Sequence, residues 1–98
     1  MIVKDVIDFF DSYSPLSYAE EFDNAGLLVG KMNDSVTGIL ICLDSTEDVI
    51  MEATNLNYNL VVSFHPIIFE GLKNLSVKNH INNSVLLAVK NNINIISV

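Results

Sequence analysis

The chain has 98 residues, of which 50% are hydrophobic and 17% are charged. A chain of this length can bury one modest core but not two independent ones. Its net charge of −7 argues against binding to nucleic acid, because phosphate contacts need a basic face, and against docking on anionic lipid.

The first predicted element is an amphipathic helix over residues 2–12, where apolar side chains recur at helical spacing. Ser14-Pro15 ends this helix. A short helix over 17–22, a loop over 23–26, a short strand over Leu27–Gly30 and a turn over 31–35 follow.

From Gly38 onward, strand and helix patterns alternate. Ile39–Leu43 is a continuous apolar run that predicts a strand buried on both faces. Ser45 or Thr46 can cap the helix that follows, which has an apolar face. The remaining predicted elements are a strand over Leu60–Ser63, a loop over 64–75, a helix over 79–91 with Ile81, Val85, Ala88 and Val89 on one side, and a strand over Ile93–Val98.

This order predicts a single α/β domain over residues 1–98, with helices packed on a mostly parallel sheet. The sequence stops at the tip of an apolar strand, so we expect it to be the N-terminal part of a longer protein. Cys42 is the only cysteine, which excludes an intramolecular disulfide. With no apolar run near the roughly 20 residues of a membrane span and no signal-peptide pattern, a cytoplasmic protein without membrane contact is expected.

In such a sheet, chemistry gathers at the carboxyl ends of the strands. His65 follows one predicted strand and Asp44 follows another, so we expect the two side chains to share a cleft. His65 is either a metal ligand or general base, or a loop histidine bonded to the backbone. Asp44 either faces a metal or phosphate-like ligand, or it simply caps the next helix.

Other polar residues have weaker patterns. Asp23 belongs to an acidic cluster that could supply carboxylates, although a solvated turn is the simpler interpretation. Asn24 is the first residue of Asn24-Ala25-Gly26, a sequence that is typical of a turn. His80, near a helix start, is interpreted as solvated, and Cys42 as inert core.

Three blocks of the sequence carry a family resemblance. The first block is P-L-S-Y-A-E-E-F-D-N-A-G-L-L-V-G over 15–30. The second, over 39–53, is a strand ending in L-D-x-T followed by a helix ending in E-A. The third is L-V-V-S-F-H-P-I-I-F-E-G-L-K-N-L over 60–75. Together they resemble the dinuclear-metal-centre family of GTP cyclohydrolase I type 2 homologues, also described as NGG-interacting-factor-like proteins.

The resemblance implies an α/β fold of two similar lobes, of which this chain is one, assembled into a toroidal hexamer. Self-association into a homo-oligomer is therefore expected. It also implies two divalent metal ions, such as zinc or iron, held by two adjacent histidines and by residues that would follow Val98. The second histidine matches His65, whereas Phe64 stands in place of the first.

Two functions follow as expectations. In the first, the full-length protein is a metal-dependent, cyclohydrolase-like hydrolase in which His65 binds the metal, with Asp44, Asp23 and Asn24 near the site. The 98-residue chain alone is then expected to be metal-poor and inactive, because one histidine does not hold a divalent ion tightly. The alternative is a non-catalytic oligomeric scaffold or protein-interaction module with a decayed metal site, which Phe64 favours.

Overall fold

The computed structural model describes residues 1–13, 26–65, 74–76 and 78–98. In chain order the described elements are α1 (Val3–Tyr13), β1 (Gly26–Val29), β2 (Ile39–Asp44), α2 (Glu47–Asn55), β3 (Leu60–His65), α3 (His80–Lys90) and β4 (Asn94–Ser97). The four described strands form one sheet in the order β1-β4-β3-β2. Strands β2, β3 and β4 are parallel, and β1 runs antiparallel to β4.

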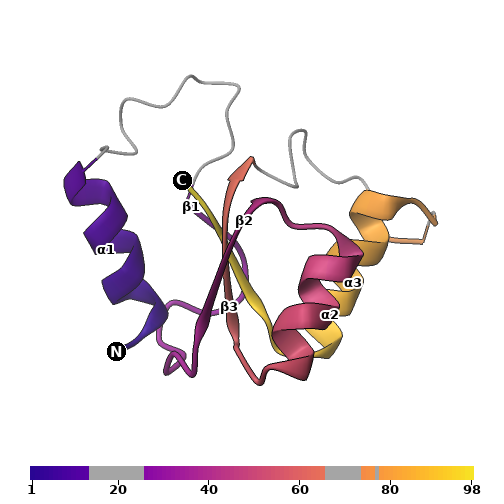
Figure 1. The fold of residues 1–98 in the computed structure, drawn as a ribbon. Coiled ribbons are helices and arrows are strands. Elements are labelled where there is room, and N and C mark those ends of the chain that lie inside the picture. Colours follow the sequence, from indigo (N-terminus) through magenta and orange to yellow (C-terminus); the bar gives the residue numbers. More distant parts are fainter. Residues whose placement is uncertain (14–25, 66–73, 77) are drawn as a thin grey trace.

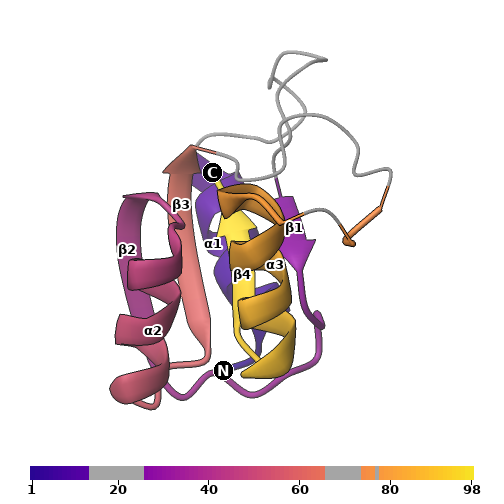
Figure 2. The same ribbon diagram turned by 90° about the vertical axis from the view of Figure 1, so that its right-hand side faces the viewer.

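Helices lie on both faces of the sheet, with α1 on one face and α2 and α3 on the other (Figures 1 and 2). The predicted α/β class with a mostly parallel sheet is therefore confirmed. The short helix predicted over 17–22 lies outside the described residues. Among the helices that are described, none is long and apolar enough to cross a membrane.

Strand β3 supplies side chains to two separate cores, because successive residues of a strand point to opposite faces. Leu60 and Val62 belong to the core under α1, whereas Val61 belongs to the core under α2 and α3. All three are fully buried. The core under α1 also contains Val3, Val6, Ile7 and Ile96, and the other core contains Val29, Ile50, Ala53, Val85, Ala88, Ile93 and Ile95.

Side-chain caps and left-handed residues set the ends of α2 and α3. The Thr46 side chain accepts a hydrogen bond from the Val49 amide, and the Asn79 side chain accepts one from the Asn82 amide. Just after the two helices, Asn57 and Asn92 have φ angles of 59° and 57°. Asparagine is one of the few residues other than glycine that tolerates this region. These turns return the chain to the start of β3 and β4.

The prediction that the Ile39–Leu43 strand is buried on both faces is wrong. Among the described strands β2 lies at an edge, and its residues alternate between exposed and half-buried from Ile39 to Leu43. Ile41 and Leu43 are 59% and 64% exposed, because α1 lies over β3 and β4 and leaves the same face of β2 uncovered (Figure 2). Val89, expected on the buried side of α3, is likewise 58% exposed.

Asn94 is a buried polar residue that joins the turn after β1 to the starts of β3 and β4. Its Oδ1 accepts a hydrogen bond from the Lys31 amide at 2.7 Å. Its Nδ2 donates to Oδ2 of Asp34 at 3.2 Å and to the carbonyl of Asn59 at 3.0 Å. Gly30 lies directly against this side chain with φ at +117°, and a Cβ there would overlap the Asn94 amide.

We expect Gly30→Ala to lower the free energy of unfolding by about 2 kcal/mol or more, because it adds backbone strain to a steric clash with Asn94. Urea unfolding followed by circular dichroism measures the change. Asn33→Ala, at an exposed position in the same turn, is the matched control and should change stability by no more than about 0.5 kcal/mol. Equal effects of the two substitutions would contradict the clash.

Candidate functional site

Asp44 and His65 are the last residues of two neighbouring parallel strands. They are paired in the β2–β3 register, and residues paired in this way project their side chains to the same face of a sheet. The Asp44 Oδ1 atom lies 3.0 Å from Nδ1 of His65. The two side chains that were expected together at the carboxyl edge therefore do contact each other.

The pair is open to solvent, since each side chain is 64% exposed. A contact this exposed adds little to folding stability, because water screens it. In the described part of the chain, Nδ1 is the ring nitrogen of His65 that has a protein partner. The pair thus offers an accessible imidazole beside a carboxylate.

The buried Ser63, two residues before His65, holds the two strand ends together. The Ser63 side chain is fully buried, and its hydroxyl donates to the Leu43 carbonyl at 2.8 Å. The same hydroxyl lies within hydrogen-bonding distance of the His65 carbonyl. Sequence reasoning missed this role, although a hydroxyl at the end of the apolar Leu60–Val62 run was a signal for it.

The structure excludes one interpretation of Asp44, as the residue that caps α2. Thr46 is the residue that caps α2, so neither Asp44 nor Ser45 has that task. Ser45 is 2% exposed, and within the described residues its hydroxyl has no hydrogen-bond partner. An unpaired buried polar atom is unusual in a folded protein. It lies next to Asp44, at the same edge of the sheet.

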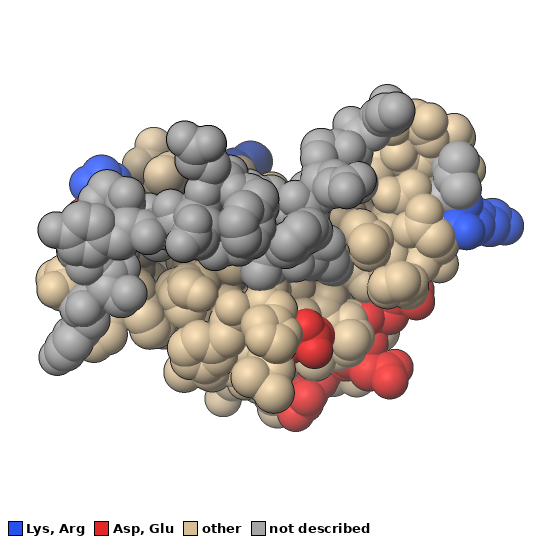
Figure 3. Space-filling model, turned by 90° about the horizontal axis from the view of Figure 1, so that it is seen from above, with Lys and Arg blue, Asp and Glu red and all other residues tan. Residues whose placement is uncertain are grey.

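Acidic side chains gather along one side of the molecule when it is viewed from the end at which β3 terminates (Figure 3). Near Asp44, the first turn of α2 carries the exposed acids Glu47 and Asp48. These negative charges stabilise α2, because they interact favourably with the positive end of the helix dipole. They also make the approach to Asp44 and His65 attractive to cations.

The described residues do not contain a complete metal site. No group of three or more His, Cys, Asp or Glu side chains lies together in the described ranges. A catalytic zinc ion takes three protein ligands, and the contact between Asp44 and His65 brings together fewer side chains than that. Phe64 is 50% exposed and has no atom that can bind a metal. Asp23 and Asn24, the other near-site candidates, lie outside the described residues.

His80 lies at the first position of α3, and its side chain is exposed, which confirms its interpretation as a solvated histidine. Asn79 immediately before it caps the helix. His80 therefore takes no part in the contact between Asp44 and His65.

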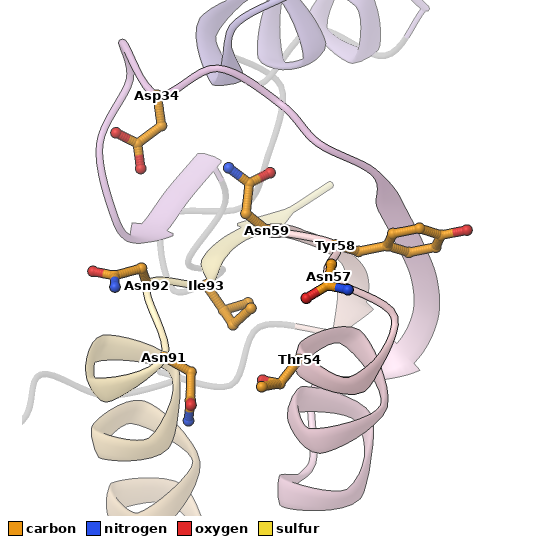
Figure 4. Close-up of a pocket in the computed structure, with 8 residues that line it drawn as sticks. All are labelled: Asp34, Thr54, Asn57, Tyr58, Asn59, Asn91, Asn92 and Ile93. Carbon is orange, nitrogen blue, oxygen red and sulfur yellow. The ribbon is translucent and has the colours of Figure 1, made fainter.

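A pocket of about 280 Å³ lies at the opposite end of the sheet (Figure 4). Its amide side chains come mainly from the turns that end α2 and α3, where Asn57 and Asn92 have positive φ. The backbone conformation of these turns explains why asparagine occurs there. The lining residues are Asp34, Thr54, Asn57, Tyr58, Asn59, Asn91, Asn92 and Ile93.

The family model described as Duf34/NIF3 (NGG1p interacting factor 3) matches residues 1–98. The chain belongs to this family. A NIF3-family relative named GTP cyclohydrolase 1 type 2 homolog, from Clostridium acetobutylicum, is 37% identical over 95 residues, which are 97% of this chain and 35% of the relative. The chain thus spans about a third of that relative's length.

Solved structures show the same fold for this part of the NIF3 family. Staphylococcus aureus protein SA1388 matches with a TM-score of 0.94 and 36% identity, over 100% of this chain and 32% of that one. A Bacillus cereus protein related to NIF3 matches with a TM-score of 0.91 and 34% identity, over 99% of this chain and 27% of that one.

Cys42 lies on β2 of this NIF3-family chain, two residues before Asp44, and is half-buried. Burial raises the pKa of its thiol, and the Asp44 carboxylate raises it further. Because folding favours the protonated thiol, the stability that Cys42 contributes is present at neutral pH. It is lost as the pH rises through the raised pKa.

We expect the Cys42 thiol to react with Ellman's reagent at pH 8 at least about tenfold more slowly in the folded chain than in guanidinium chloride. In the folded chain the raised pKa lowers the fraction of reactive thiolate, and the half-buried side chain is less accessible to the reagent. Absorbance at the thionitrobenzoate band measures both rates. Equal rates would show that the thiol is neither shielded nor held protonated.

Proposed function

We propose that this chain forms one lobe of a metal-dependent, hydrolase-like protein in which His65 is a ligand of a divalent metal ion. The observation that carries the proposal is the exposed contact between His65 and Asp44 at the carboxyl edge of two parallel strands. Imidazole is the commonest metal ligand in proteins. A carboxylate partner on its other nitrogen is the usual companion of a metal-bound histidine.

The chemistry of the described donors fits part of a divalent metal site. His65 supplies one imidazole, Asp44 lies 3.0 Å from it, and the acids of α2 add negative potential. A bound divalent ion would supply an activated water for hydrolysis. The relatives named GTP cyclohydrolase 1 type 2 homolog make a cyclohydrolase-like reaction the first one to assay in the whole protein. In this proposal the protein is cytoplasmic, where Cys42 stays reduced.

We expect the 98-residue chain to bind Co²⁺ weakly, with a dissociation constant on the order of a millimolar, because it offers fewer donors than a full metal site. Isothermal titration and the visible absorption of Co²⁺ measure the binding. His65→Ala should abolish it, whereas His80→Ala, the matched control at an exposed helix start, should leave it unchanged.

Two results would contradict this proposal. Unchanged Co²⁺ binding by the His65→Ala chain would show that His65 is not the ligand. Stoichiometric metal retained by the wild-type chain after dialysis against a weak chelator would contradict the argument from donor number.

A second function, as a protein-interaction module that associates with copies of itself, is favoured by a different surface. On the α1 side of β2 and of the end of β3, a row of apolar side chains is exposed beside the edge of β2 that no other described strand pairs with. Within Ile39–Leu43 the strand has no charge and no proline, the usual devices that keep an edge from pairing. The row consists of Ile39, Ile41, Leu43 and Phe64, with exposed fractions of 36%, 59%, 64% and 50%.

We expect the chain to self-associate at high concentration, and Ile41→Lys to shift it toward the monomer, because a charge at the centre of the β2 edge opposes pairing. Sedimentation velocity over a concentration series measures this. Asn55→Lys adds the same charge at an exposed site on α2 and should leave association unchanged. A wild-type chain that remains monomeric at millimolar concentration would rule out this surface as a self-association site.

A further inference from the structure

The contact between Asp44 and His65 determines which ring nitrogen is protonated. A carboxylate has only acceptor atoms, so the imidazole nitrogen that faces it must carry the hydrogen. The nitrogen facing Asp44 is Nδ1, at 3.0 Å. In a neutral imidazole the lone pair then lies on Nε2, the nitrogen farther from the backbone.

The backbone places the two residues side by side. Asp44 and His65 are direct partners in the parallel register, and the buried Ser63 hydroxyl lies between the carbonyls of Leu43 and His65. The hydroxyl has one hydrogen, so it donates to one of these two carbonyls at a time and keeps the two strand ends close together. With the strand ends aligned in this way, the Asp44 carboxylate lies at Nδ1 of His65 in the chain without a ligand.

Asp44 has no competing structural task in the described part of the chain. Thr46 caps α2, and the hydrogen-bond partner of the Asp44 side chain is the His65 ring. The side chain is 64% exposed, so it also contributes little packing. Its observed geometry is accounted for by its contact with His65.

We infer that Asp44 is a positioning residue for His65, holding the ring in the Nδ1–H tautomer so that Nε2 is presented to a divalent metal ion. The inference rests on the proposed function for the identity of the ligand, but the tautomer itself can be measured without metal. A carboxylate that accepts a hydrogen bond from the remote ring nitrogen of a ligating histidine orients the ring and raises its basicity. The role assigned to Asp44 is of this kind.

The experiment is a long-range ¹H–¹⁵N spectrum of the metal-free chain at pH 8.5, where histidine is normally neutral. This spectrum distinguishes a ring nitrogen with a hydrogen from one with a lone pair. We expect wild-type His65 to be mainly in the Nδ1–H form. His80 in the same spectrum is an internal reference, because its exposed side chain should show the Nε2–H form that a free imidazole prefers.

In Asp44→Ala we expect His65 to revert to the Nε2–H form. Asp48→Ala removes an exposed acid from the first turn of α2 and should leave the His65 tautomer unchanged. Amide shifts of β3 residues show whether each variant keeps its fold. A role limited to stabilising the strand ends would alter those shifts or the melting temperature without changing the tautomer.

The inference is overturned if wild-type His65 is in the Nε2–H form, or if Asp44→Ala leaves the tautomer as it was. A titration with Co²⁺ then tests the consequence, and we expect Asp44→Ala to weaken binding about tenfold. Absence of Co²⁺ binding by a wild-type chain with the Nδ1–H tautomer would contradict the proposed function and leave the tautomer assignment standing.

Discussion

Parallel pairing of β3 with strands on both sides is the constraint on which the rest of this structure depends. The first four residues of β3 are fully buried, and they supply both cores because alternate side chains face opposite layers. The same pairing aligns the carboxyl ends of β2 and β3. The contact between Asp44 and His65 is therefore a direct result of the register that forms the hydrophobic core.

Much of the fold could be predicted from local sequence patterns. The features that could not be predicted depend on the order of the strands in the sheet. Helical periodicity and apolar runs placed the described helices and strands to within a few residues, because both signals are local. Strand order is set by long-range contacts, so Ile39–Leu43 had the apolar run of a central strand but lies at an edge. The contact between Asp44 and His65 could be predicted from the rule for strand ends. Thr46 was one of two candidate caps, and the sequence could not choose between it and Ser45 because both have a hydroxyl at the helix start. The role of Ser63 depends on its neighbour across the sheet, which a local pattern does not give.

The two proposed functions use different faces of β2, so they do not exclude one another. Asp44 and His65 are paired at the strand ends, while Leu43 and Phe64 belong to the alternate residues on the α1 side. Self-association through the apolar row would leave the pair on the other face of the same strands. Loss of metal binding in one member of the family would likewise leave the apolar row intact.

The close packing of Gly30 against Asn94 has a consequence for how this sequence can diverge. A side chain at position 30 needs the space that the Asn94 amide occupies, while that amide satisfies the Lys31 backbone and joins two other segments. A smaller residue at position 94 would have to arise before any side chain at position 30. Until a new acceptor compensated the Lys31 amide, that intermediate would be less stable than either endpoint. The two positions, 64 residues apart in the chain, are thus expected to covary, and glycine at position 30 restricts the mutational paths open to β4.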